Sequence, residues 1–389
     1  MISLFDFPET KIYVLLEEEF RKLFFSSAFD IIGGRKELAK FLGVGYTAVN
    51  EWFHGYKKRS KNKITVQYCP IKAIKRIATL NFKDVNLVND VEKHITSYRS
   101  WSGACINKPI LPISENYKLL NIIAHILGDG SFTEHSMPYF SNSYEELRKE
   151  FIKNLNIFGK VEYLESFSSE TPRVFFPTAI IHILRKKYKI DFKNKNFLDS
   201  SIIFNLPKDL ICSFLKGIFD DEGYVSDSNV QICSSKKKLL FLSRELLNRL
   251  DIMSSKIFRY QEHYRKDGSI SKVYYFDIYS NDLEKFQNLI NFTHPKKREF
   301  LESIIKRKNR KWKYPNSNSI INIILNELEK NKTMTARDLS IKTMLSARNL
   351  RKNYLYSMER NNLITRFGKR RGKGGANLWK LNKQIHLNY

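Results

Sequence analysis

The sequence predicts a mixed α+β protein with a duplicated central domain and a helical module on either side of it. Two segments of similar pattern, residues 122–130 and 215–223, lie in the middle of the chain and indicate the duplication. Two short helices joined by a glycine-containing turn are expected before them, and helices followed by a basic hairpin after them. The expected domains span residues 1–104, 105–312 and 313–389.

The composition indicates a partner that carries many negative charges. The 389 residues include 67 Lys and Arg against 40 Asp and Glu, which leaves a formal net charge of +27. Nucleic acid and anionic membrane surfaces are the common partners of such chains. No apolar run approaches the ~18 residues of a membrane span, no secretory signal pattern opens the chain, and no Cys-x-x-Cys pair occurs. We therefore expect a nucleic-acid-binding protein of the cytoplasm, associated with the nucleoid, or of an organelle, and no membrane partner.

Residues 35–55 are expected to form the first DNA-binding unit. Apolar residues at helical spacing predict a helix that ends at Gly43 and a second helix over residues 46–54. This pattern resembles the helix-turn-helix of phage-repressor-like regulators, in which the second helix enters the major groove. A helical hairpin that only packs is the alternative. The candidate DNA contacts are Tyr46, Thr47, Asn50, Lys57, Lys58 and Arg59.

The two central segments are predicted to be helices that pack on each other. Residues 122–130 read IIAHILGDG and residues 215–223 read LKGIFDDEG. Small residues, Ala124 and Gly128 in the first segment and Gly217 in the second, leave little bulk on one stripe of each helix. Two such helices can cross at close range.

Each segment ends in an acid followed by a glycine. Gly130 and Gly223 are expected to end the helices in the left-handed conformation. If the helices lie side by side, Asp129 and Glu222 emerge at the same end, close together. Paired carboxylates suit hard divalent cations such as Mg²⁺, for which Mn²⁺ is a possible substitute. Such an ion can support cleavage of a phosphodiester.

The two segments resemble the paired motifs of the LAGLIDADG family, the homing endonucleases and their relatives. The resemblance covers roughly residues 115–311 and includes Leu-Pro-Lys at 206–208 and Phe-Thr-His-Pro-Lys-Lys at 292–297. It implies a pseudo-twofold core of two αββαββα halves, whose saddle-shaped antiparallel sheets bind double-stranded DNA. Two motifs in one chain further imply a monomer.

The resemblance also implies the residues of the site. The acids at the eighth motif position, Asp129 and Glu222, bind the catalytic divalent metal, and the preceding residues, Gly128 and Asp221, are further candidate ligands. One lysine in each half is expected to act on the metal-bound water or the phosphate. The candidates are Lys296 or Lys297 in the second half and Lys193 or Lys195 in the first.

Two positions depart from the family pattern. Leu127 stands where an acid is usual, and Asp221 stands where a small residue is usual. The second departure leaves open whether Asp221 or Glu222 points inward, although the motif register favours Glu222. The histidines His125 and His182 are expected to be packed rather than metal-bound.

From about residue 316 the pattern changes to helices followed by a basic turn. Residues 320–328, 335–339 and 346–361 are expected to be helical, and two strand-like runs flank the turn GKRRGKGG. This arrangement resembles a winged helix, and a helical cap with a solvated loop is the alternative. The candidate DNA contacts are Lys369, Arg370, Arg371 and Lys373.

The resemblance implies a Mg²⁺-dependent, site-specific DNA endonuclease. The alternatives are a sequence-specific DNA-binding regulator on the same scaffold and an RNA-splicing maturase. Intact acids at Asp129 and Glu222 favour the enzyme, whereas two helix-turn-helix-like modules favour the regulator.

Overall fold

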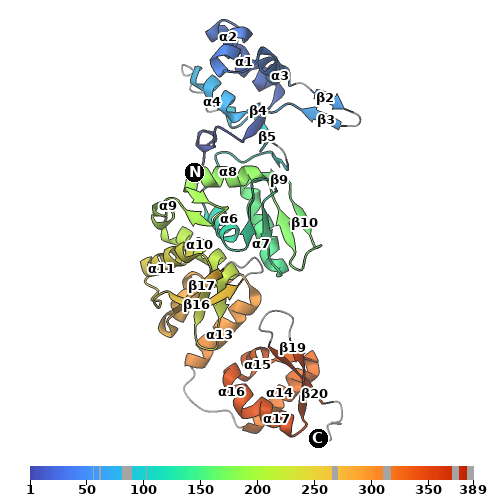
Figure 1. The fold of residues 1–389 in the computed structure, drawn as a ribbon, viewed down its shortest axis with the longest axis vertical. Coiled ribbons are helices and arrows are strands. Elements are labelled where there is room, and N and C mark those ends of the chain that lie inside the picture. Colours follow the sequence, from blue (N-terminus) through green and yellow to red (C-terminus); the bar gives the residue numbers. More distant parts are fainter. Residues whose placement is uncertain are drawn as a thin grey trace. The chain divides into compact units, whose positions relative to one another are not determined.

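The computed structural model (Figure 1) has mixed α+β architecture, as predicted, and every strand pair whose register it describes is antiparallel. It describes residues 1–55, 57–60, 63–80, 90–101, 103–264, 270–309, 317–369 and 376–382. One compact unit comprises Met1–Glu222, Ser234–Leu250 and Tyr260–Tyr274. The other comprises Gly223–Cys233, Asp251–Arg259 and Tyr275–Tyr389. No helix in these described ranges is long and apolar enough to cross a membrane.

Four helices form a module near the N-terminus, after the short helical turn η1 (Leu4–Asp6). They are α1 (Glu18–Ile32), α2 (Arg35–Leu42), α3 (Tyr46–His54) and α4 (Ile71–Leu80). Phe24, Leu38, Val49 and Ile74 are fully buried and form the core of this module. Gly43 ends α2 in the left-handed conformation, as predicted. Strands β2 (Lys57–Ser60) and β3 (Lys63–Val66) form a hairpin directly after α3.

A five-stranded sheet joins this module to the middle of the chain. Its order is β4-β1-β5-β6-β9. The strands are β1 (Tyr13–Leu16), β4 (Cys69–Pro70), β5 (Ile95–Arg99), β6 (Ile106–Asn107) and β9 (Lys160–Val161). Because β5 pairs with β6 across residue 104, the boundary predicted between residues 104 and 105 does not separate compact units.

Helices α6 (Tyr117–Leu127) and α10 (Lys208–Glu222) pack against each other, as predicted from their small residues. A Cβ atom added to Gly217 would lie only 2.7 Å from the Cβ of Ala124. The glycines after the acids differ from the prediction, because neither ends its helix in the left-handed conformation. Gly130 and Gly223 instead begin strands. Gly130 is needed because an added Cβ would lie 2.5 Å from the backbone of Ile126.

Each of these helices begins the same succession of elements. The first half continues with β7 (Gly130–Ser131), β8 (Tyr139–Ser141), α7 (Glu145–Leu155), β10 (Leu164–Ser166), β11 (Arg173–Phe175) and α8 (Thr178–Tyr188). The second continues with β14 (Gly223–Val225), β15 (Val230–Ser234), α11 (Lys237–Arg249), β16 (Phe258–Tyr264), β17 (Ile270–Ile278) and α12 (Leu283–Leu289). The sheet orders β10-β11-β8-β7 and β16-β17-β15-β14 correspond strand by strand. The predicted αββαββα duplication is therefore confirmed.

Short elements connect and follow the halves. The helical turn η2 (Asn156–Phe158) precedes β9, and the hairpin β12 (Ile190–Asp191) and β13 (Asn196–Phe197) is followed by α9 (Ser201–Phe204). The helical turn η3 (Ser280–Asp282) precedes α12, and α13 (Pro295–Asn309) follows it.

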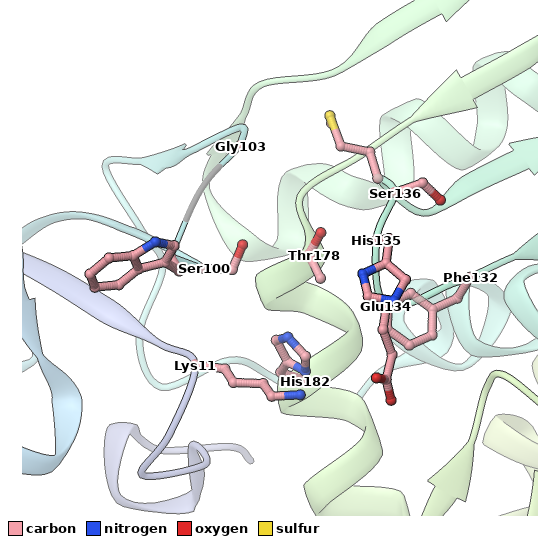
Figure 2. A pocket seen from close by; sticks show the side chains of 11 residues that line it. Lys11, Ser100, Gly103, Phe132, Glu134, His135, Ser136, Thr178 and His182 are labelled. Carbon is pink, nitrogen blue, oxygen red and sulfur yellow. The ribbon is translucent and has the colours of Figure 1, made fainter.

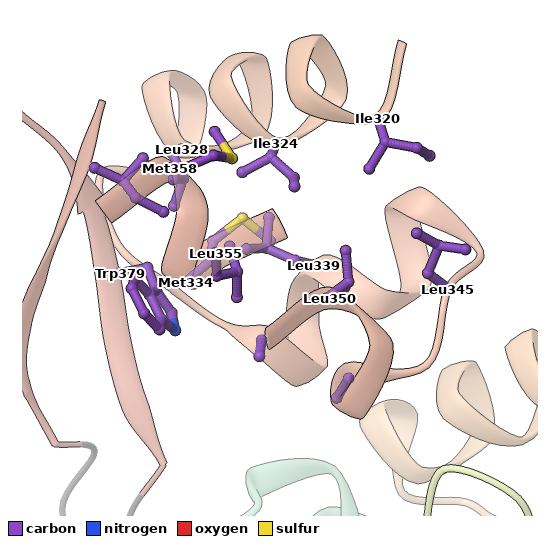
Figure 3. Close-up of a cluster of buried hydrophobic side chains, with 13 residues drawn as sticks. Ile320, Ile324, Leu328, Met334, Leu339, Leu345, Leu350, Leu355, Met358 and Trp379 are labelled. Carbon is purple, nitrogen blue, oxygen red and sulfur yellow. The ribbon is translucent and has the colours of Figure 1, made fainter. Parts of the chain in front are cut away.

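The C-terminal region alternates helices and strands around its own hydrophobic core (Figure 3). The elements are α14 (Ser317–Asn331), β18 (Met334–Thr335), α15 (Ala336–Thr343), α16 (Ala347–Leu350), a π-helical turn (Arg351–Leu355), α17 (Tyr356–Arg360), β19 (Ile364–Lys369) and β20 (Asn377–Leu381). Thr335 caps α15 as predicted, since its hydroxyl accepts from the Asp338 backbone at 3.1 Å.

One helix in this region differs from the prediction. The continuous helix expected over residues 346–361 is interrupted by the π-helical turn. Its wider winding brings residues five apart onto one face. Leu350 and Leu355 are consequently fully buried, whereas Tyr354 is only half-buried.

Candidate active site

Asp129 and Glu222 are close enough to influence each other's charge. Asp129 follows α6 after one glycine, and Glu222 is the last residue of α10. Burial and then the Asp129 carboxylate raise the pKa of Glu222 to about 7, whereas the Lys195 ammonium acts in the opposite direction. The packed motif helices thus bring two carboxylates into a partly buried site, where burial and mutual repulsion favour the binding of a cation.

The two acids have matching hydrogen-bond partners. The Asn142 amide donates to Asp129 Oδ2 at 3.0 Å, and the Ser234 hydroxyl donates to Glu222 Oε1 at 3.3 Å. Asn142 directly follows β8, and Ser234 ends β15, the corresponding strand of the other half. These residues lie 13 and 12 positions after their acids. Neither was predicted from the sequence, although a polar residue at nearly the same distance after each motif was available as a signal.

Lys195 is the lysine of the first half that reaches the site. Its Nζ donates to the backbone carbonyl of Gly128, and it interacts electrostatically with Asp129 and Glu222. Burial lowers the pKa of Lys195, and the two carboxylates oppose that change. Lys193, the other first-half candidate, is exposed. The positive charge of Lys236, which was not among the predicted site residues, also lowers the pKa of Lys195.

The carboxylate of Asp221 has internal partners that were not predicted. Its side chain is fully buried, and its two oxygens lie 3.0 and 3.1 Å from His125 Nδ1. Asp221 Oδ2 also accepts from the Asp129 backbone N–H at 3.2 Å. His125 and the Asp129 backbone thus satisfy this carboxylate internally, and its role as a metal ligand stays a prediction. Both acids at this end of α10 oppose the lowering of the Lys195 pKa, Glu222 more strongly than Asp221.

Gly128 leaves space for the buried Asp221 carboxylate, and His125 contacts it. A Cβ added to Gly128 would lie 2.4 Å from Asp221 Oδ2. His125 is fully buried, as expected for a packed histidine. Burial lowers the pKa of His125, but Asp221 outweighs this effect and raises it to about 9. The unusual acid at the seventh position of the second motif is thus matched by a histidine in the first.

The second-half lysine candidates lie on α13, in the other compact unit. Lys296 is exposed, and Lys297 Nζ lies 5.9 Å from the centre of the Phe292 ring. The Lys297 backbone N–H donates to His294 Nδ1 at 3.3 Å. The catalytic roles of Lys296 and Lys297 remain predictions.

The predicted DNA contacts of the flanking modules are only partly described. Tyr46 and Thr47 are exposed on α3, whereas Asn50 Oδ1 accepts from Arg35 at 2.6 Å. Lys57, Lys58 and Arg59 lie on β2 and Lys369 ends β19, but their side chains are outside the described part of the structure. Arg370, Arg371 and Lys373 lie outside the described residues altogether.

A separate pocket of about 420 Å³ lies in the first unit (Figure 2). Lys11, Trp101, Phe132, His135 and His182 are among its lining residues, which include neither acid of the candidate active site. Burial lowers the pKa of His182 to about 4, so this imidazole is neutral at pH 7. The pocket is therefore distinct from the paired carboxylates.

Parts of this chain are similar to known proteins. Residues 209–291 match the family described as LAGLIDADG-like domain. Probable translation initiation factor IF-2 of Methanocaldococcus jannaschii is 30% identical over 216 residues, which are 53% of this chain and 18% of that protein. A glutamine–fructose-6-phosphate aminotransferase of the same organism is 28% identical over 210 residues, or 50% of this chain and 18% of that one. The chain thus spans about a fifth of the length of these relatives.

Two solved structures are also similar to parts of this chain. One concerns mesophilic variants of the homing endonuclease I-DmoI, at 18% identity, with 45% of this chain and 97% of that chain covered and a TM-score of 0.33. The other is full-length DUF199/WhiA from Thermatoga maritima, at 14% identity, with 64% of this chain and 92% of that chain covered and a TM-score of 0.33. On the family match, residues 209–291 of this chain form a LAGLIDADG-like domain.

Replacing Glu222 with glutamine is expected to stabilise the metal-free protein increasingly as the pH rises. The pKa of Glu222 is raised to about 7, so the folded state holds its proton more tightly than the unfolded chain. Wild-type stability therefore declines as the pH rises through about 7, and the glutamine variant lacks that decline. Between pH 5 and pH 8 in EDTA, urea unfolding should show the advantage of Glu222→Gln growing by on the order of 1–3 kcal/mol. An advantage that is constant with pH would contradict the raised pKa.

Proposed function

We propose that this protein is a metal-dependent, site-specific DNA endonuclease in which Asp129 and Glu222 jointly hold a divalent cation. The observation that carries the proposal is the meeting of these two carboxylates in a partly buried site, where burial and then the Asp129 charge raise the pKa of Glu222 to about 7. A structural pair of acids without a cation would destabilise the fold, so the arrangement favours function over packing. The match of residues 209–291 to the LAGLIDADG-like domain supports the same reaction class.

The donor set suits Mg²⁺ or Mn²⁺. It consists of the carboxylates of Asp129 and Glu222 and the Gly128 carbonyl, which in the metal-free structure accepts from the Lys195 ammonium. Among the described residues, no three His, Cys, Asp or Glu side chains group as a metal site, so phosphate and water oxygens would complete the coordination. A bound divalent ion would supply an activated water and stabilise negative charge on the phosphate.

The surrounding side chains have distinct positioning roles in this proposal. Asn142 and Ser234 orient the two carboxylates, one in each half. Asp221 holds the Asp129 backbone, with His125 as its partner. The Lys195 ammonium, which donates to the Gly128 carbonyl, would hold a phosphate oxygen there when the substrate displaces it from Gly128.

Double-stranded DNA is the substrate that the charge of the chain favours. A net charge of +27 can neutralise many phosphates. The relatives that share about half of this chain are named as an initiation factor and an aminotransferase, and the shared segment makes up only 18% of each. Because those two activities are unrelated, the shared segment is best explained as a separable module with its own activity.

A DNA-binding regulator is the second candidate, and the flanking modules favour it. In the C-terminal region the order helix, strand, helix, helix, strand, strand is that of a winged helix. Selection of duplexes from a randomised library in Ca²⁺, followed by incubation of the best-bound duplex in Mg²⁺, separates the two functions. An endonuclease cuts both strands at one position. Tight binding without cleavage in Mg²⁺ or Mn²⁺ would instead indicate a DNA-binding regulator.

The basic turn after β19 is expected to bind DNA phosphates. Changing Lys369, Arg370, Arg371 and Lys373 to glutamine in the full chain should weaken DNA binding and flatten the dependence of log K on log salt, by about 0.9 for each phosphate that the turn no longer neutralises. The control is Lys93→Gln/Lys149→Gln, because both exposed lysines already pair with a neighbouring acid. Titrations between 50 and 200 mM salt measure the slope. A slope equal to that of the wild type would assign the turn to another role.

A further inference from the structure

Backbone hydrogen bonds tie the N-terminal helices to the first half of the central domain. Strands β1 and β4 stand before and after helices α1–α3, and both belong to the five-stranded sheet. Its register runs from Tyr13 opposite Arg99, through Ser97 opposite Asn107, to Ile106 opposite Val161. The module is therefore joined to the central domain by continuous sheet rather than by a single linker.

A second tie lies at the start of the chain. Ile2 and Ile113 exchange two backbone hydrogen bonds of 2.8 and 2.9 Å, and both side chains are fully buried. Lys186 of α8 donates to the Phe7 carbonyl at 3.1 Å, and the Phe7 ring contacts Tyr98 of β5. Two ties at separate places oppose rotation of the module about either one.

Helix α3 is itself fixed to this sheet by one buried guanidinium. Arg21 donates to the Phe53 and His54 carbonyls at the end of α3, at 3.2 and 3.3 Å, and to Leu16 of β1 at 3.5 Å. Gly55 follows α3 at φ 64°, and a Cβ there would lie 2.4 Å from Arg21. The position of α3 is thus set relative to β1, and through the sheet relative to the central domain.

We propose that α3 and the hairpin β2–β3 read the duplex beside the central site at a fixed number of base pairs from it. The inference rests on the proposed DNA binding by the central domain. Tyr46 and Thr47 are exposed on α3, and the hairpin sequence carries Lys57, Lys58 and Arg59. Each added base pair moves a flanking sequence by about 3.4 Å and turns it by about 34°. Because the sheet fixes the N-terminal helices to the central domain, α3 cannot move along the duplex to follow a displaced flanking sequence.

The test uses the full chain and binding in Ca²⁺. Footprints of the wild type and of Tyr46→Ala/Thr47→Ala on the best-bound duplex identify the flank that α3 contacts. Affinity is then compared for the intact duplex, for one with that flank scrambled, and for duplexes with two or five base pairs inserted before it. Scrambling should weaken wild-type binding about tenfold or more, and either insertion should weaken it as much. The variant should bind all four duplexes alike.

Two results would overturn the inference. Full affinity for the duplexes with insertions would mean that the module is flexibly attached, and full affinity for the scrambled flank would mean that α3 reads no DNA. Leu23→Ala, on an exposed position of α1, is the control and should behave as the wild type. The experiment measures binding and not cleavage. Absence of cleavage in Mg²⁺ would therefore contradict the proposed endonuclease activity but would not contradict the fixed spacing proposed for α3.

Discussion

Asp129→Asn and Glu222→Gln should each lower double-strand cleavage by about a thousandfold or more while changing DNA affinity by less than about threefold. An amide keeps the size of the carboxylate but removes the charge that holds the cation, whose stabilisation of the reacting phosphate is worth several kcal/mol. Binding depends on many other interactions with phosphates and bases. Cleavage of both strands and affinity in Ca²⁺ are measured on the same duplex.

Two exposed acids serve as controls for the loss of charge. Asp209 lies in the first turn of α10, the helix that ends at Glu222, and Glu146 lies in the first turn of α7. The control variants are Asp209→Asn and Glu146→Gln. Both variants should cleave at nearly the wild-type rate. Cleavage that survives Asp129→Asn and Glu222→Gln would show that the reaction takes place elsewhere.

Bulk at the crossing of α6 and α10 should strongly destabilise the central domain. Gly217→Val places side-chain atoms where a Cβ already lies 2.7 Å from the Cβ of Ala124 and 3.3 Å from the Asn121 carbonyl oxygen. Since both helices are buried there, we expect the free energy of unfolding to fall by on the order of 3 kcal/mol, measured by urea unfolding of the full chain. Cleavage should fall as well, because the crossing positions Asp129 against Glu222.

A methyl exchange distinguishes this crowding from a general intolerance of substitution. Gly217→Ala should destabilise the protein, and adding Ala124→Gly should restore most of the stability. The double variant moves one methyl group from α6 to α10, so the crossing holds the same volume. The gain in helix propensity at residue 217 nearly cancels the loss at residue 124. Gly45→Ala, whose Cβ would meet open space, should cost less than about 1 kcal/mol. If the double variant is no more stable than Gly217→Ala, the close approach to Ala124 is not the reason that this position needs glycine.

The fold of the centre could be predicted because its signals are local. Acid-glycine pairs at half-domain spacing and small residues on one stripe sufficed to place α6 against α10 and Asp129 beside Glu222. The capping of α15 by Thr335 followed from four adjacent residues. Such features depend on spacing within a single helix or turn, which the sequence displays directly.

The remaining features depend on contacts between distant segments. The partner of Asp221 was not foreseen because nothing in its own helix shows that His125, 96 residues earlier, would bind it. Asn142 and Ser234 reach the acids only through the pairing of β7 with β8 and β14 with β15. The pairing of strands across residue 104 was not foreseen for the same reason, since the two-residue strands β6 and β9 are too short to give a periodic signal.

Binding of Mn²⁺ to the complex of the protein with its own duplex would show whether the two acids share a cation. Electron paramagnetic resonance reports bound Mn²⁺ without requiring a reaction, and equilibrium titration gives its affinity. We expect tight Mn²⁺ binding by the wild type, weakened by about tenfold or more in both Asp129→Asn and Glu222→Gln, because each removes one charged ligand. Mn²⁺ bound as tightly by either variant as by the wild type would contradict a cation held jointly by Asp129 and Glu222.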